Sequence, residues 1–314
     1  MIVLRDFDKS FFRKDSIVTV GTFDGVHLGH RQIFKTLNEI SISGNLRKVA
    51  VTFEPHPRIV LSGDKPEVKI LTTSGEKLRY LEELGVDVVY IIEFTRKFAE
   101  TSAVDFYKDY LLGKIGLSHL VIGYDHSFGK NREGTFDTIK GLSAEHNFGY
   151  TKVEQYSVGN EIVSSSLIRK YLNTGQIDAA TKLLGYNYSV DGKVISGDKR
   201  GQKIGFPTAN IKVENTHKLI PAVGVYAVKV NIDFVTYYGM MNIGFRPTVK
   251  EKGSLLPEIH IFDFNEDIYG KEISVEFLSF IREEKKFNSI EELKLQLQKD
   301  KENLIKNLNH FINK

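Results

Sequence analysis

Two histidines lie in a glycine-rich segment near the start of the chain. The segment Val20–His30 reads V-G-T-F-D-G-V-H-L-G-H, and it places His27 and His30 three residues apart. β-Branched residues before it predict a buried strand, and apolar residues at helical spacing after it predict a helix. On the first turn of that helix the two imidazoles share a face, beside free N–H groups and the positive end of the helix dipole. Imidazoles placed there can bind phosphate and stabilise charge that builds up during phosphoryl chemistry.

The other residues of this turn favour phosphate binding over the alternatives. The glycines let the backbone bend and let a ligand approach closely. The predicted phosphate site contains Gly21, Phe23, Asp24, Gly25 and Gly29. A metal pair is a weaker interpretation, because zinc needs further ligands and the chain has no cysteine to supply them. Ordinary polar residues at a helix start are the remaining alternative.

The bulk composition indicates a two-domain globular protein. The chain has 314 residues, of which 41% are hydrophobic and 26% charged, enough for two cores. A net charge of +3 from interspersed charges does not indicate a nucleic-acid partner. The N-terminus lacks the pattern of a signal peptide, and no run of apolar residues is long enough to span a membrane. We therefore expect a cytoplasmic protein without a membrane partner; the composition is also compatible with a homo-oligomer.

Strands and helices are predicted to alternate through the first half of the chain. Strands are expected at 17–20, 48–53, 88–92, 119–122 and 150–156, and helices at 74–84, 102–112, 135–145, 166–172 and 177–184. This order predicts an α/β doubly wound parallel sheet that binds ligands at the carboxyl ends of its strands. The pattern then changes to strands and turns, followed by a C-terminal helix. We therefore expect domains at residues 1–184 and 185–314.

Two loops at predicted strand ends are candidate walls of a ligand site. The first contains Pro55, His56 and Pro57, with two prolines that stiffen the backbone. The second is rich in glycine and basic residues and contains Asp125 and Phe128. Taken alone, each loop could equally be an ordinary turn.

A serine run at the start of a later helix is a second candidate phosphate site. Ser164, Ser165 and Ser166 provide hydroxyls and free N–H groups, and Arg169 can reach back toward them from the next turn. A simple serine cap with a surface arginine is the alternative.

The second half opens with a loop rich in glycine and lysine. The loop lacks the Walker A pattern, but its backbone can wrap phosphates. Its candidate phosphate-binding residues are Gly197, Lys203, Gly205, Phe206 and Pro207. Thr208 and Asn210 add neutral oxygen ligands of the kind that Mg²⁺ accepts. A hairpin with a polar turn is the alternative.

Several of these segments resemble one enzyme family. H-L-G-H is similar to the H-x-G-H signature of nucleotidyltransferases, and the longer G-T-F-D-G-V-H-L-G-H resembles the adenylyltransferase half of bifunctional bacterial riboflavin kinase/FAD synthetases. The serine run resembles the I-S-S-T-x-x-R element, although Leu167 stands where these enzymes often have arginine. G-F-P-T-A-N at 205–210 resembles the riboflavin kinase signature, and segments at 221–226, 242–248, 258–264 and 281–287 resemble its other elements in order.

The resemblance implies two reactions and assigns roles to residues. The C-terminal part, expected to be a Greek-key β-barrel, would phosphorylate riboflavin with ATP, giving FMN and ADP. Glu258 would be its general base and Arg282 a flavin-binding residue. The two loops with Pro55, His56, Pro57, Asp125 and Phe128 would also bind flavin. The N-terminal part would join AMP to FMN, giving FAD and pyrophosphate, with His27, His30 and Arg169 as catalytic residues. Both steps would need Mg²⁺.

Two rival functions remain open from the sequence. One is a nucleotidyltransferase for nicotinamide mononucleotide or phosphopantetheine, against which the kinase-like second half argues. The other is a protein that binds flavin or nucleic acid without catalysis.

Overall fold

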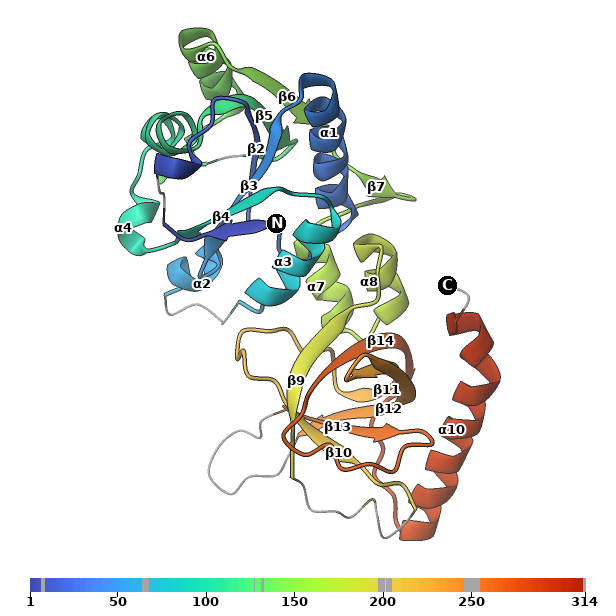
Figure 1. The fold of residues 1–314 in the computed structure, drawn as a ribbon. Coiled ribbons are helices and arrows are strands. Elements are labelled where there is room, and N and C mark those ends of the chain that lie inside the picture. Colours follow the sequence, from blue (N-terminus) through green and yellow to red (C-terminus); the bar gives the residue numbers. More distant parts are fainter. Residues whose placement is uncertain are drawn as a thin grey trace. The chain divides into compact units, whose positions relative to one another are not determined.

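The computed structural model describes residues 1–6, 9–63, 68–126, 128–130, 133–196, 201, 205–245 and 255–312, with side chains as far as residue 306. The chain forms two compact units, Met1–Ser165 and Ser166–Lys314, which we call unit 1 and unit 2 (Figure 1). Helix α7 (Ser165–Asn173) begins at the division, and α8 (Ile177–Leu184) belongs to unit 2. The functional boundary expected after Leu184 stays a prediction.

Unit 1 contains a six-stranded sheet in which every pair of neighbours is parallel. The strands are β1 (Ile2–Leu4), β2 (Ser16–Val20), β3 (Arg47–Glu54), β4 (Val88–Glu93), β5 (Leu117–Gly123) and β6 (Gly149–Val153). Their order is β1-β4-β3-β2-β5-β6. After β2 the chain adds β3 and β4 on one side and β5 and β6 on the other, and the first strand, β1, pairs with the outer edge of β4. The predicted doubly wound sheet is confirmed. The three-residue edge strand β1 was not predicted, because it is too short and exposed to show an alternating pattern.

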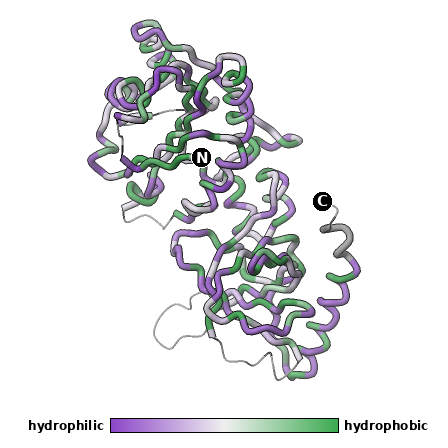
Figure 2. The backbone as a smooth tube through the Cα atoms, in the orientation of Figure 1, coloured by the Kyte–Doolittle hydropathy of each residue, from purple (hydrophilic) through white to green (hydrophobic). Residues whose placement is uncertain are grey.

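Helices cover both faces of this sheet. The helical elements are η1 (Lys9–Phe11), α1 (Leu28–Gly44), α2 (Pro57–Leu61), α3 (Ser74–Glu83), α4 (Arg96–Ala99), α5 (Ala103–Asp105), η2 (Phe106–Ile115) and α6 (Phe136–His146). Buried residues of α1 and α3 pack on one face, and buried residues of η2 and α6 pack on the other. A β-hairpin formed by β7 (Ser157–Val158) and β8 (Glu161–Ile162) precedes the end of the unit. The strands of the sheet are largely hydrophobic along their length (Figure 2).

The helix predicted at 102–112 differs in kind from the observed one. A single α-helical turn leads into η2, a π-helix of ten residues. Apolar spacing marks a helix here, but it does not distinguish the wider π-helical turn from the α-helical one.

Unit 2 is a closed antiparallel barrel followed by a long helix. Its strands are β9 (Ser189–Ile195), β10 (Ala209–Lys212), β11 (Gly224–Ile232), β12 (Val235–Phe245), β13 (Leu255–Ile261) and β14 (Glu272–Arg282). Strands β11, β12 and β13 are consecutive neighbours and β14 returns beside β11, which is the predicted Greek-key order. Helix α10 (Ile290–Ile312) packs Leu297 and Leu304 onto Phe206, Met240 and Phe262 on the outer face of the barrel.

Candidate active sites

The glycine-rich turn after β2 is held in a strained conformation. Gly21 N–H donates to Val51 O at 3.0 Å and extends the pairing with β3. Beyond it Phe23 and Val26 have positive φ angles of 47° and 33°, which bulky side chains rarely adopt. Both side chains are buried, with 1% and 0% exposure, so packing holds the backbone in place. Strain of this kind is characteristic of functional sites.

Hydrogen bonds to the carboxylate of Asp24 hold the turn in place. Its Oδ1 accepts hydrogen bonds from Leu71 N at 2.8 Å and Thr72 N at 3.1 Å. The hydroxyl of Thr72 accepts in turn from Gly25 N at 3.0 Å. The carboxylate therefore joins the turn to a segment 47 residues later in the chain.

His27 and His30 lie in contact at the start of α1. His27 is the N-cap of the helix, and its Nδ1 accepts from His30 N at 3.3 Å. The two rings are stacked with centroids 3.6 Å apart. Because Nδ1 of His27 is an acceptor, the ring proton of its neutral form lies on Nε2. The cap thus leaves Nε2–H as the donor of this ring.

His30 is held in its neutral form. Desolvation, the neighbouring His27 and the positive charge of Lys77 keep the pKa of His30 well below its usual 6.5. Its Nδ1 is buried and has no hydrogen-bond partner among the described residues. Such a ring contributes as a neutral hydrogen-bonding group at pH 7.

The serine segment reaches this turn within unit 1. Ser165 Oγ donates to Asp24 O at 2.9 Å. A Cβ on Gly29 would lie 3.8 Å from Val163 O and 3.2 Å from the ring of His27, so glycine permits this close packing. Ser164 adjoins these residues in the chain. Ser166 and Arg169 belong to α7 in unit 2, and their part in an ATP site stays a prediction.

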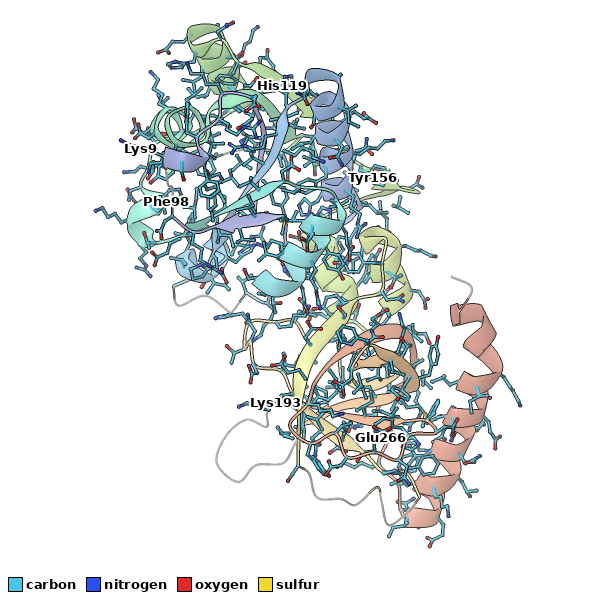
Figure 3. All side chains as sticks on the ribbon, viewed as in Figure 1. Lys9, Phe98, His119, Tyr156, Lys193 and Glu266 are labelled. Atoms are coloured by element: carbon cyan, nitrogen blue, oxygen red, sulfur yellow. The ribbon has the colours of Figure 1, made fainter. Side chains whose placement is uncertain are left out.

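The two predicted flavin loops meet through aromatic side chains. Phe53, at the end of β3, stacks on Phe128 with centroids 5.7 Å apart. Phe128 also packs against Phe106 of η2 with ring centroids 3.9 Å apart. Phe98, which is labelled in Figure 3, lies against both rings. The loop containing Pro55, His56 and Pro57 follows Phe53 directly, and its His56 caps α2 by accepting from Arg58 N at 3.1 Å. The loops after β3 and β5 therefore adjoin at one edge of the sheet.

A half-buried histidine, His126, supports the second loop beside Asp125. His126 Nε2 lies 2.9 Å from the hydroxyl of Tyr107 on η2. Burial lowers the pKa of His126 to about 4, although the charge of Asp125 opposes the shift. Burial also raises the pKa of Tyr107. The pair is therefore neutral at pH 7, and it ties the loop to the π-helix.

In unit 2 the strand register places three polar residues in one row. Glu258 of β13 pairs with Asn210 of β10 on one side and with Asn242 of β12 on the other. Directly opposite residues point to the same face, so the carboxyl of Glu258 lies between two amides. Asn242 Nδ2 also donates to Glu284 at 3.4 Å. Asn242 was not predicted, because only the register shows that it adjoins Glu258.

Asn210 fits the predicted role of a cation ligand. Its Oδ1 is buried and has no hydrogen-bond partner among the described residues. Thr208 precedes it by two residues and is half-buried. Two neutral oxygens beside a carboxylate suit a hard cation that is also held by phosphate and water. No group of three or more histidine, aspartate or glutamate side chains is arranged for a metal in the described part of the chain.

Two further contacts fix the surroundings of this row. Arg282 pairs with Val225, which itself pairs with Asn242, and Arg282 Nε donates to Asp300 of α10 at 2.8 Å. His260 Nδ1 donates to Pro207 O at 2.8 Å and its ring packs against Phe206. The segment before Thr208 is therefore held by β13. Gly197 and Lys203 lie outside the described residues, and Gly205 has a positive φ of 82°.

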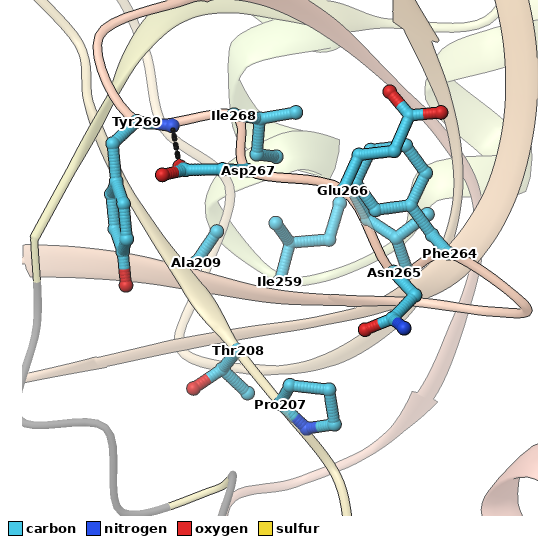
Figure 4. A pocket seen from close by; sticks show the side chains of 11 residues that line it. Pro207, Thr208, Ala209, Ile259, Phe264, Asn265, Glu266, Asp267, Ile268 and Tyr269 are labelled. Atoms are coloured by element: carbon cyan, nitrogen blue, oxygen red, sulfur yellow. Dashed lines mark hydrogen bonds between the residues drawn. The ribbon is translucent and has the colours of Figure 1, made fainter.

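A cavity of about 300 Å³ adjoins Thr208 (Figure 4). It is lined by residues 207–209, by Ile259 and Ile261 of β13, and by the segment 264–269. Its walls are apolar at the two isoleucines and acidic at Glu266 and Asp267. The cavity thus lies next to the candidate cation ligand.

Comparison with known proteins finds matches along nearly the whole chain. A family model described as FAD synthetase matches residues 10–167, and one described as riboflavin kinase matches residues 184–308. A Listeria monocytogenes protein described as a bifunctional riboflavin kinase/FMN adenylyltransferase is 41% identical over 92% of this chain and 91% of its own length. A Bacillus subtilis protein of the same description is 40% identical over 93% of this chain and 92% of its own length.

A solved structure also has this fold. The crystal structure of a Streptococcus pneumoniae protein described as a macrolide-efflux protein aligns with a TM-score of 0.86 and 31% identity, covering 96% of this chain and 98% of that one. None of the helices in the described ranges combines the length and the apolar character that crossing a membrane requires.

Proposed function

The chain belongs to the bifunctional riboflavin kinase/FMN adenylyltransferase family, and we propose that each of its two units catalyses one of the family's two reactions. Enzymes of this family phosphorylate riboflavin to FMN and adenylylate FMN to FAD, and this chain carries both matching parts. Unit 1 performs the adenylyl transfer and unit 2 performs the phosphorylation. The observation that carries the assignment is the pair of His27 and His30 at the carboxyl end of β2, where the sheet order reverses.

In unit 1 the phosphate of FMN is already an anionic nucleophile. Catalysis then requires alignment and stabilisation of the triphosphate rather than a general base. His27 and His30 supply hydrogen-bond donors at the start of α1, and Ser164 and Ser165 adjoin them. The roles of Ser166 and Arg169 in binding ATP, expected from the sequence, remain part of this proposal. The isoalloxazine ring lies against the loops after β3 and β5, which meet at Phe53 and Phe128.

In unit 2 Glu258 takes the proton of the riboflavin hydroxyl as it attacks the γ-phosphorus of ATP. Its position between Asn210 and Asn242 supports this role, because the amides orient the carboxylate. Thr208 and Asn210 hold Mg²⁺, which supplies positive charge to the phosphates of ATP. Arg282, fixed by Asp300, borders the flavin.

Incubation of the full chain with riboflavin, ATP and Mg²⁺, followed by chromatography, tests this function. We expect FMN to appear first and FAD to follow. A chain that binds flavin without forming either product would contradict the assignment, and so would transfer of AMP to a different mononucleotide in preference to FMN. Because ATP is an intracellular substrate, we place the enzyme in the cytoplasm. The proposal includes neither a nucleic-acid nor a membrane partner. The oligomeric state of the protein can be measured by light scattering.

A further inference from the structure

Lys77 is a buried cation in unit 1 that neither reaction step above employs. It lies on α3 with 8% of its surface exposed. Its Nζ donates to Thr52 Oγ1 at 3.1 Å. An ammonium group carries three donors, and among the described residues this hydroxyl is the one acceptor that it reaches. A buried charge with unused donors is costly unless it serves a ligand.

The hydroxyl partner is itself fixed. Thr52 Oγ1 donates to Thr22 O at 3.3 Å, in the turn that leads to His27. Its oxygen therefore accepts from Lys77, and the ammonium is held beside the phosphate-binding turn. Burial lowers the pKa of Lys77 to about 8, while the carboxylates of Asp24 and Glu54 oppose the shift. The side chain is thus mainly charged at pH 7.

The neighbouring carboxylates have hydrogen-bond partners of their own. Asp24 Oδ1 accepts from the backbone of Leu71 and Thr72. Glu54 Oε2 accepts from Arg5 at 2.8 Å and from Ser74 Oγ at 3.0 Å. Both anions are therefore satisfied without a direct hydrogen bond from Lys77.

Arg47 is a second buried cation of the same sheet, and it reaches three acceptors although its Nε has none among the described residues. Its guanidinium donates to Phe11 O, Ser16 Oγ and Ile115 O at 2.7, 2.7 and 3.2 Å. It lies at the first residue of β3, at the amino ends of the strands. Lys77 lies instead at the carboxyl ends, where Thr52 follows the pairing of Val20 with Val51. Ligands of such sheets bind at that end.

Lys77 lies between the expected triphosphate site and the expected flavin site of unit 1. On one side its charge reaches His30, whose pKa it helps to lower. On the other side Thr52 is followed along β3 by Phe53 and then by the loop of Pro55, His56 and Pro57. A cation at this point would be near both the phosphate of FMN and the triphosphate of ATP.

We propose that the ammonium of Lys77 binds the phosphate of FMN and holds it against the α-phosphorus of ATP. The inference rests on the proposed function of unit 1. An FMN phosphate oxygen forms a bond to the α-phosphorus, the bond from that phosphorus to the bridging oxygen breaks, and its electron pair leaves with pyrophosphate. Lys77 keeps its proton throughout and offsets the repulsion between the two anions. It is a positioning residue for the acceptor substrate.

The test measures FAD formation from FMN by the full chain carrying Lys77→Met or Lys77→Arg. Loss of one charged hydrogen-bonding partner reduces binding by about ten- to a hundredfold. We expect Lys77→Met to raise KM for FMN by that factor while KM for ATP changes less than about threefold. We expect Lys77→Arg to recover most of the loss, because the guanidinium keeps the charge. The exposed Lys35 of α1 provides the matched control, and Lys35→Met should leave both constants unchanged.

Each alternative outcome has its own meaning. Normal FAD kinetics in Lys77→Met would make Lys77 a structural counter-ion and overturn the inference. A larger rise in KM for ATP than for FMN would assign it to the triphosphate, which also overturns it. If Lys77→Met unfolds unit 1, Lys77→Gln preserves a donor for Thr52 without the charge and gives the same comparison. Absence of FAD formation in the unmutated chain would instead refute the proposed function itself.

Discussion

Replacing His27 by asparagine separates the structural role of this residue from its catalytic role. In the structure Nδ1 of His27 caps α1 by accepting from His30 N at 3.3 Å, and Nε2 is the remaining donor. Asparagine is among the best N-cap residues, so its side-chain oxygen can take over the bond to His30 N. The shorter amide has no donor where Nε2 lies. His27→Asn should therefore keep the helix and lose the donor.

The expected magnitudes differ for the two roles. Removing one preorganised donor to developing charge lowers kcat by about a hundred- to a thousandfold in comparable sites. Removing a cap costs about 1 kcal/mol of stability. We expect His27→Asn to form FAD from FMN about a hundredfold more slowly, with thermal unfolding of unit 1 nearly unchanged. His27→Ala should show the same loss of rate together with the additional loss of stability.

The assay follows FAD from FMN and, separately, FMN from riboflavin in the same purified variant. Formation of FMN is the internal control, because unit 2 contains its own site. An His27→Asn protein that makes FAD at a near-normal rate would show that Nε2 donates nothing to the reaction. Equal loss of both activities in a folded variant would indicate one shared site and would refute the division between the units.

Four further outcomes are expected. Glu258→Gln should lower kcat for FMN formation by roughly a hundred- to ten-thousandfold at saturating ATP, with FAD formation from FMN intact; a near-normal kcat would remove the assignment as base. Thr208→Ala should raise the Mg²⁺ concentration needed for half-maximal phosphorylation, and chelation of Mg²⁺ should stop both reactions. Because the pKa of His126 is about 4 in the folded chain and 6.5 in the unfolded chain, the unfolded state takes up the proton first as the pH falls. The free energy of unfolding should therefore be highest above pH 6.5 and fall by up to about 3 kcal/mol between pH 6.5 and 4. Denaturant titrations of His126→Gln should show a smaller decrease over this pH range. The fragment 186–314 should still convert riboflavin to FMN, and a folded fragment that makes no FMN would show that unit 2 is not the kinase. The longer fragment 166–314 should melt at a higher temperature, because it keeps the four buried residues of α8.

Local patterns in the sequence determined the elements and the main turn of unit 1. β-Branched residues before Gly21 and apolar spacing after His30 depend on neighbours along the chain, so strand, turn and helix follow from sequence alone. The alternation of strands and helices then required a parallel sheet, because parallel neighbours need a crossover. The candidate residues themselves were read mainly from a family resemblance.

The environment of those residues was decided by tertiary structure. The neutral state of His30 depends on desolvation and on Lys77, which is 47 residues away in the chain. Asn242 adjoins Glu258 only because β12 pairs with β13 in one particular register. A lone lysine in a helical pattern carries no sign that its ammonium will be buried, since that depends on α3 packing over the end of β3. Sequence spacing sets the face on which a side chain lies, whereas its solvation, its charge partners and its distance to a ligand arise from contacts between segments that only the folded chain brings together.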